Sequence, residues 1–109
     1  PSRLLAAEIT REKIYLRLHD ELPYASAVVT ESWKDNKDGS ARIDQTIYVE
    51  RDGQKAIIIG KGGQTLQDIG SSSRAEIERL LDTKVYLDIH VKVVKEWQRD
   101  PKALNRLGF

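Results

Sequence analysis

Four consecutive residues, Gly60, Lys61, Gly62 and Gly63, limit what this chain can fold into more than any other feature. They follow the most apolar run of the sequence, in the stretch KAIIIGKGGQTLQDIG that extends from residue 55 to residue 70. Glycine costs about 1 kcal/mol relative to alanine inside a helix or strand, so a regular element should not contain three glycines so close together. A flexible linker would be polar on both sides, whereas three isoleucines precede this cluster. We therefore expect a tight junction whose backbone is closely approached by another group.

Two nucleotide-binding motifs also place glycines after an apolar run, and neither fits this spacing. The P-loop requires a glycine, four further residues and then a Gly-Lys-Ser/Thr triplet, which does not occur in the chain. The dinucleotide fingerprint G-x-G-x-x-G, counted from Gly60, requires a glycine where the chain has Thr65. The spacing therefore argues against both enzyme classes.

The third interpretation is a GXXG loop, formed by Gly60, Lys61, Gly62 and Gly63. Glycines without Cβ atoms allow a phosphodiester chain to lie against the loop backbone. A helix that begins at Gln64 would direct unpaired N–H groups and its positive dipole end toward phosphates. Lys61 would add a mobile positive charge. This chemistry predicts single-stranded RNA as the ligand.

The residues on either side of the loop support the same interpretation. Lys55 and Lys61 are the cations between residues 53 and 67, and this window contains no acidic residue. The isoleucines that end at Ile59, together with Leu66 and Ile69, are expected to form the floor of a groove for unstacked bases. A turn between two helices that needs glycine only for its backbone geometry remains an alternative at this point.

Hydrophobic periodicity and turn residues predict an α+β domain, with three strands and with helices covering one face of the sheet. The short run at residues 56–59 is compatible with a buried strand or a helical turn. The predicted elements are a helix over residues 2–22 ended by Pro23, a strand over 25–33, a hairpin connection over 34–40, a strand over 41–50, a helix over 64–81, a strand over 84–93 and a short helix from Asp100 to Gly108.

The same periodicity predicts which side chains face the core. Tyr48 is expected to be exposed on the outward face of its strand, and Trp97 is expected to anchor the tail helix. His19 and His90 are expected at the surface, without a metal or a catalytic role. The inward residues are expected to be Leu5, Ile9, Ile14, Leu18 and Leu22 in the first helix, Leu66, Ile69, Ser73, Ile77, Leu80 and Leu81 in the helix over 64–81, and alternate residues from Val85 to Val93 in the last strand.

Composition bounds the class of protein. The chain has 109 residues, of which 39% are hydrophobic and 32% are charged, and this suits one globular domain. The net charge of +1 is not the strongly basic balance of a protein that binds duplex DNA. The absence of cysteine excludes disulfides and thiolate catalysis and is compatible with a reducing cytoplasm. Because the sequence contains no methionine, we interpret it as a fragment of a longer protein.

The whole chain resembles the C-terminal KH domain of the Era family of bacterial GTPases. The similarity is densest in VERDGQKAIIIGKGGQTLQDIGSSSRAEIERLL, residues 49–81, and continues through KVYLDIHVKVVKEWQRDPKALNRLGF, residues 84–109. It extends back to EITREKIYLRLHDELPYA, residues 8–25. The resemblance implies a single type II KH domain over residues 1–109, with a three-stranded mixed sheet backed by helices and a short helix before the glycine loop.

The resemblance also implies a function. The expected ligand is single-stranded RNA at the 3′ end of small-subunit ribosomal RNA, bound during ribosome maturation in the cytoplasm. Gly60 to Gly63 match the family's GXXG motif, and Ser71 to Ser73 depart from the usual sequence at a place expected to matter less for RNA. GTP and magnesium are expected only in an upstream GTPase domain that this chain lacks, so the chain itself needs no cofactor and is not an enzyme. A peripheral association of the full protein with membranes is a further expectation.

A protein-interaction domain is the second function class. It would use the open face of the sheet or the tail to dock onto a partner, without direct contact to RNA. Lys61 and the window without acidic residues favour RNA, whereas the modest net charge keeps the docking interpretation open.

Overall fold

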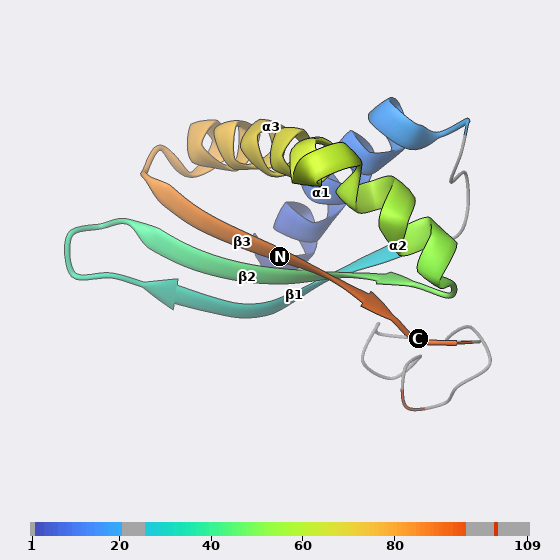
Figure 1. Cartoon of the computed structure of the whole chain (residues 1–109). Helices are drawn as coiled ribbons and strands as arrows, with labels where there is room; N and C mark the ends of the chain where they lie inside the picture. The colour runs from blue at the N-terminus through green and yellow to red at the C-terminus, as the bar shows by residue number, and fades with distance from the viewer. Residues whose placement is uncertain (1, 21–25, 96–101, 103–109) are drawn as a thin grey trace.

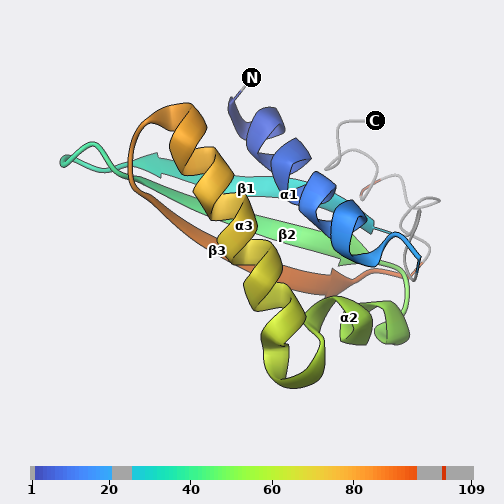
Figure 2. The same ribbon diagram turned by 90° about the horizontal axis from the view of Figure 1, so that it is seen from above.

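The computed structural model describes residues 2–20, 26–95 and 102. Within these ranges, three α-helices and three strands form two layers, and α1 and α3 lie over one face of the sheet (Figure 1). Seen from above, α1 and α3 cross the sheet side by side, and α2 lies at the end near the glycine loop (Figure 2). The elements are α1 (Ser2–Leu18), β1 (Ser26–Asp35), β2 (Ala41–Val49), α2 (Asp52–Ile59), a 3₁₀ turn (Lys61–Gly63), α3 (Gln64–Leu81) and β3 (Val85–Val93).

The sheet is mixed, with strand order β1-β2-β3. β1 and β2 form an antiparallel hairpin with an irregularity between Thr30 and Ser32, whereas β2 and β3 run parallel. The parallel pair requires a crossover, and α2 and α3 supply it. These elements confirm the α+β class and the three-stranded mixed sheet, and they show that the run at residues 56–59 is helical.

The boundaries differ slightly from those predicted. α1 ends at Leu18 and not at residue 22, because His19 and Asp20 form a turn in which the His19 N–H donates to the Tyr15 carbonyl. Both residues have low helix propensity. The predicted tail helix, Trp97 and Pro23 lie outside the described residues.

The hairpin turn is fixed by its own polar groups. The Asp38 carboxylate accepts hydrogen bonds from the Ser40 N–H and hydroxyl, at 2.9 and 2.6 Å. The hydrogen bond from the Ser40 hydroxyl, followed by that from the Ser40 N–H, lowers the pKa of Asp38 below its usual value. Gly39 has φ +89°, a backbone conformation that favours glycine.

The core lies between the helices and the sheet and contains two hydrophobic clusters. One joins Ile14 and Ile58 to β2, and the other joins Ile9 and Ile77 to the start of β3. Alternate side chains of β3 from Val85 to Val93 face this layer, as predicted. A buried hydrogen bond of 2.6 Å from the Thr10 hydroxyl to Gln45 Oε1 also joins α1 to the central strand.

Three predictions of burial were wrong. Leu5 and Leu80 are 51% and 57% exposed, because the buried stripes of the two helices run through neighbouring positions such as Ala6, Ile9 and Ile77. Tyr48 is only 5% exposed, although it is on the outward face of β2. Its hydroxyl donates a 2.7 Å hydrogen bond to Glu31 of β1.

Candidate nucleic-acid interface

The turn from α2 into α3 builds the glycine loop. α2 begins where the Gln54 side chain accepts hydrogen bonds from the backbone N–H groups of Glu50 and Arg51, both at 2.9 Å. It ends at Gly60, whose N–H donates to the Ala56 carbonyl at 2.9 Å. Ile58 of α2 is completely buried, so the helix that leads into the loop is fixed to the core.

The three glycines of the loop have positive φ, but they do so under different constraints. Gly60 has φ +73° and ψ 176°, and a Cβ added there would overlap the Thr65 hydroxyl and lie 2.6 Å from Thr65 Cβ. Gly62 and Gly63, with φ +61° and +77°, would place a Cβ in open space. Gly60 is therefore required for close packing. Gly62 and Gly63 are required for their backbone conformation, and they leave the surface of the loop bare.

Positive charge dominates near the loop. Lys61 is exposed, Lys55 is half-buried, and neither forms an ion pair with any described residue. The acidic residue that follows in sequence, Asp68, is bound by Arg17 at 2.9 Å and by the Gln64 side chain at 2.8 Å. A carboxylate neutralised in this way does not oppose an anion at the loop.

The amino-terminal end of α3 has no side-chain cap. Gly63 is its N-cap residue, and the N–H groups of Gly63 and Gln64 donate to the Gly60 and Lys61 carbonyls of the preceding 3₁₀ turn. The helix dipole favours negative charge at this end.

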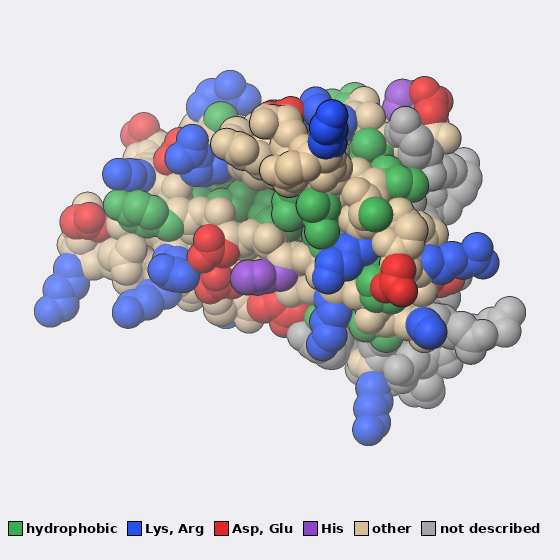
Figure 3. Space-filling model, viewed as in Figure 1, with side chains coloured by type: hydrophobic (Ala, Val, Ile, Leu, Met, Phe, Trp, Pro, Cys, Tyr) green, Lys and Arg blue, Asp and Glu red, His purple; other side chains and the backbone are tan. Residues whose placement is uncertain are grey.

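A groove of about 420 Å³ extends from the loop between α3 and β3, and we call it the α3–β3 groove. Among the described strands β3 is at the edge of the sheet, so its outer backbone groups have no partner strand in that part of the chain. In Figure 3 hydrophobic side chains are visible between α3 and the sheet edge, with Lys and Arg side chains near them. The lining residues are Gly63, Leu66, Gln67, Gly70, Ser71 and Arg74 from the loop and α3, and Leu87 and Ile89 from β3.

Gly70 determines how wide this groove is. A Cβ at this position would lie 3.9 Å from Cδ1 of Ile89, across the space between helix and strand. A larger side chain would therefore fill the groove. Arg74, one turn further along α3, is exposed and forms no ion pair with any described residue, so it is an unneutralised cation in the lining.

The structure brings the predicted residues Gly60, Lys61, Gly62, Gly63 and Gln64 together in one turn. Of the predicted set, Gly63 lines the groove, whereas Lys55 and Ile59 on α2 are half-buried and are not among its lining residues. The prediction that Leu66 and Ile69 form the floor of the base groove was partly wrong. Leu66 lines the groove, but Ile69 belongs to the core.

Sequence reasoning missed Gln67, Gly70, Ser71 and Arg74 on the groove side of α3, and Leu87 and Ile89 on β3. The signal for Gly70 was present, because a glycine inside a strong helix pattern often has a packing or functional reason.

His19 and His90 are exposed, as predicted. No group of three or more His, Asp or Glu side chains among the described residues could hold a metal ion, and no described helix is long and apolar enough to cross a membrane.

Comparison with known proteins defines the class first. The family model of the KH domain matches residues 21–98, and the chain belongs to this family. The chain is thus a binding domain and not a catalytic one. Over all of its 109 residues it is 57% identical to the GTPase Era of Caulobacter vibrioides and 55% identical to that of Brucella suis, which confirms the resemblance to Era. It spans 34% and 35% of the length of those two relatives, about a third.

Solved structures agree. A crystal structure of an Aquifex aeolicus Era variant bound to GDP and AlF4 superposes with a TM-score of 0.90 at 42% identity, covering 99% of this chain and 36% of that one. A crystal structure of Era in complex with MgGDPNP and nucleotides 1506–1542 of 16S ribosomal RNA gives a TM-score of 0.91 at 42% identity, with the same coverage.

Proposed function

We propose that this chain binds single-stranded RNA, with the backbone of the RNA on the Gly60–Gly63 loop and its bases in the α3–β3 groove. The ligand proposed is the 3′ end of small-subunit ribosomal RNA, bound during ribosome maturation. The observation that carries the proposal is the junction of a bare, positively charged glycine loop with an apolar groove along an open strand edge.

The loop suits a phosphodiester backbone. Gly62 and Gly63 have no side chains that would keep a sugar-phosphate chain away, and the positive dipole end of α3 favours the negative charge of its phosphates. Lys61 and Lys55 supply positive charge from the loop and from α2. A clamp of this kind holds about four nucleotides.

The groove suits unpaired bases. Leu66, Leu87 and Ile89 offer apolar surface to base faces, while Gln67 and the outer backbone of β3 offer groups that hydrogen-bond to base edges. Paired bases present neither faces nor Watson–Crick edges, so this geometry favours single strands over duplexes. Arg74 is in position to neutralise a phosphate beyond the clamp.

The identity of the RNA rests on the relatives. The matching Era structure contains a fragment of 16S ribosomal RNA, and the chain is similar to that protein over 99% of its own length. We propose that the chain is one domain of a longer cytoplasmic GTPase, with GTP and magnesium bound outside this segment and with peripheral membrane association of the full protein. The chain spans only about a third of its relatives, which leaves room for such a domain.

The charged side chains on the outer face of the sheet make the protein-docking alternative less favourable than RNA binding. Arg42 on this face pairs with Asp88 at 2.9 Å, and the Ser32 hydroxyl donates to Asp44 at 2.6 Å. Exposed Lys92 lies on the same face, so this is a charged surface, whereas the core of a protein interface is depleted of charged residues.

The test is filter binding of a single-stranded RNA with the ribosomal 3′-end sequence. Lys61→Asp should weaken binding about tenfold or more, because a charge-assisted contact worth roughly 1.5–3 kcal/mol is lost and repulsion is added. Lys37→Asp makes the same change of charge on an exposed lysine in the hairpin turn and should leave binding within about twofold. Equal weakening by the two variants would contradict the assignment of the loop.

A further inference from the structure

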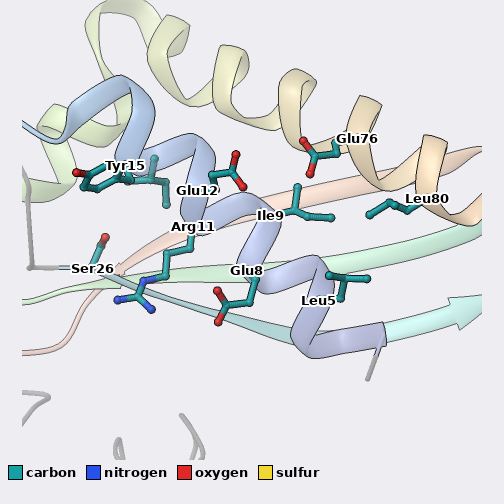
Figure 4. A pocket seen from close by; sticks show the side chains of 10 residues that line it. Leu5, Glu8, Ile9, Arg11, Glu12, Tyr15, Ser26, Glu76 and Leu80 are labelled. Atoms are coloured by element: carbon teal, nitrogen blue, oxygen red, sulfur yellow. The ribbon is translucent and has the colours of Figure 1, made fainter.

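Among the described residues two ion pairs join α1 to α3, at different distances from the glycine loop. Lys13 pairs with Glu76 at 2.6 Å, and Arg17 pairs with Asp68 at 2.9 Å. Glu76 and Leu80 line, from α3, a hollow of about 580 Å³ between the two helices (Figure 4). Because both pairs connect the same two helices, comparing them separates what an ion pair does for the fold from what it does for the loop.

The position of each carboxylate along α3 determines whether its charge acts on the loop. Asp68 is four residues beyond Gln64, about 6 Å along the helix, whereas Glu76 is twelve residues beyond it, about 18 Å. The Debye length is about 10 Å at 0.1 M ionic strength, so a phosphate at the loop is exposed to the charge of Asp68 but largely screened from that of Glu76. Asp68 is also the one acidic residue between positions 53 and 75 of the sequence.

Both carboxylate oxygens of Asp68 have a partner. Oδ2 is 2.9 Å from Arg17 Nη2, and Oδ1 accepts a hydrogen bond of 2.8 Å from Gln64 Nε2. Gln64 directly follows the glycine loop, so these three side chains connect α1 to the start of α3. The Arg17 and Asp68 side chains are 46% and 38% exposed, and an ion pair this exposed adds little to stability. The pair therefore matters more for the charge that it cancels than for the fold.

We infer that Arg17, which lines neither the loop nor the α3–β3 groove, is a positioning residue for RNA binding. It cancels the charge of Asp68 and holds this carboxylate, with the Gln64 amide bound to it, on the side of α3 that faces α1. Without Arg17, an unpaired carboxylate would lie one turn from the loop and repel the phosphates that Lys61 attracts. This inference rests on the proposed function, because it names a residue outside the RNA site that sets the affinity of that site.

Filter binding of the single-stranded ribosomal 3′-end RNA to Arg17→Ala and Lys13→Ala tests the inference. Each variant removes one cation and one ion pair between α1 and α3. At an ionic strength of about 0.1 M, Arg17→Ala should weaken binding about two- to threefold, because a negative charge near the loop is uncovered. Lys13→Ala should leave binding unchanged. It breaks the more buried of the two pairs, so a purely structural effect would be larger in Lys13→Ala than in Arg17→Ala.

Two further variants separate the charge of Asp68 from a direct contact between Arg17 and RNA. Adding Asp68→Asn to Arg17→Ala removes the uncovered charge and keeps an oxygen that can accept the hydrogen bond from Gln64, so it should restore the affinity of the unaltered chain. Arg17→Lys keeps a cation opposite Asp68 and should bind RNA like the unaltered chain. If Arg17 contacted RNA directly, the double variant would remain as weak as Arg17→Ala.

The outcomes distinguish this inference from the proposed function. If the unaltered chain binds the RNA, three results would overturn the inference alone: unchanged affinity of Arg17→Ala, equal weakening by Lys13→Ala, or a double variant as weak as Arg17→Ala. If the unaltered chain binds no RNA, the proposed function fails and the inference fails with it.

Discussion

Replacing the first or the second glycine of the loop should separate its structural role from its role in binding. Alanine at position 60 must adopt φ +73° and ψ 176°, a region accessible essentially to glycine alone. Its Cβ would also lie 2.6 Å from Thr65 Cβ and 3.0 Å from the Thr65 backbone nitrogen. Alanine at position 62 has φ +61° and ψ 21°, with no atom within 4 Å of its Cβ.

The expected magnitudes follow from these two environments. At Gly60, backbone strain of about 1–3 kcal/mol and overpacking of about 1–3 kcal/mol act together, so the free energy of unfolding should fall by roughly 2–6 kcal/mol. At Gly62 only the left-handed backbone is unfavourable, at about 1 kcal/mol. A domain with a stability of about 10 kcal/mol, the middle of the usual range, remains folded in both variants.

Urea unfolding measures this difference directly. With a slope of about 2 kcal/mol per molar urea, the midpoint should fall by roughly 1–3 M for Gly60→Ala and by about 0.5 M for Gly62→Ala. Combining Gly60→Ala with Thr65→Gly should recover part of the loss, because the contact with the Thr65 side chain is then removed. Equal midpoints for the two alanine variants, or no coupling to Thr65, would refute the close-packing role of Gly60.

Three further outcomes are expected. Gly70→Leu should leave the free energy of unfolding unchanged or raise it by up to about 1 kcal/mol, since glycine is a poor helix former. The same change should weaken RNA binding at least tenfold, because the leucine side chain fills the groove. Unchanged binding would exclude the groove as the base site. Arg74→Ala should make the slope of log K against log salt shallower by about 0.7. Arg79 is exposed and lies outside the groove, so Arg79→Ala should leave the slope unchanged. Equal slopes for the two variants would contradict the proposed phosphate contact of Arg74. Asp38 has a lowered pKa in the folded chain, so its ionised form stabilises the hairpin at pH values above its ordinary pKa of 3.8, and this stabilisation is lost as pH falls through the lower folded pKa. Ser40→Ala should return the pKa of Asp38 toward 3.8 in an NMR titration. An unchanged pKa would contradict the assigned cause.

The sequence was sufficient for the class of fold because its strongest patterns are local. Strict alternation predicted both β2 and β3, and a 3.6-residue period predicted α3 with the bounds that the structure shows. Patterns that depend on the third dimension were predicted less well. Leu5 and Leu80 fit an inward stripe by spacing, but the buried stripes of α1 and α3 run through neighbouring positions such as Ile9 and Ile77. Tyr48 is buried although alternation places it on the outward face of its strand.

The site divides in the same way. The GXXG loop is contiguous in sequence, so its position could be predicted from the glycines alone. The groove beside it is formed by two elements, α3 and β3, and which of their faces meet depends on the crossover. Gly70 and Arg74 therefore became candidates only when Leu87 and Ile89 were seen opposite them.

The central claim is that the glycine loop and the α3–β3 groove together bind unpaired RNA, and competition binding at two salt concentrations tests it most directly. Single-stranded RNA of the ribosomal 3′-end sequence should compete strongly, and the duplex of the same sequence only weakly. With phosphate contacts from Lys55, Lys61 and Arg74, log K should fall against log salt with a slope of about −2, at roughly 0.7 per contact for single strands. Equal affinity for the duplex, or a slope several times steeper, would contradict this account and would indicate binding by a diffuse basic surface.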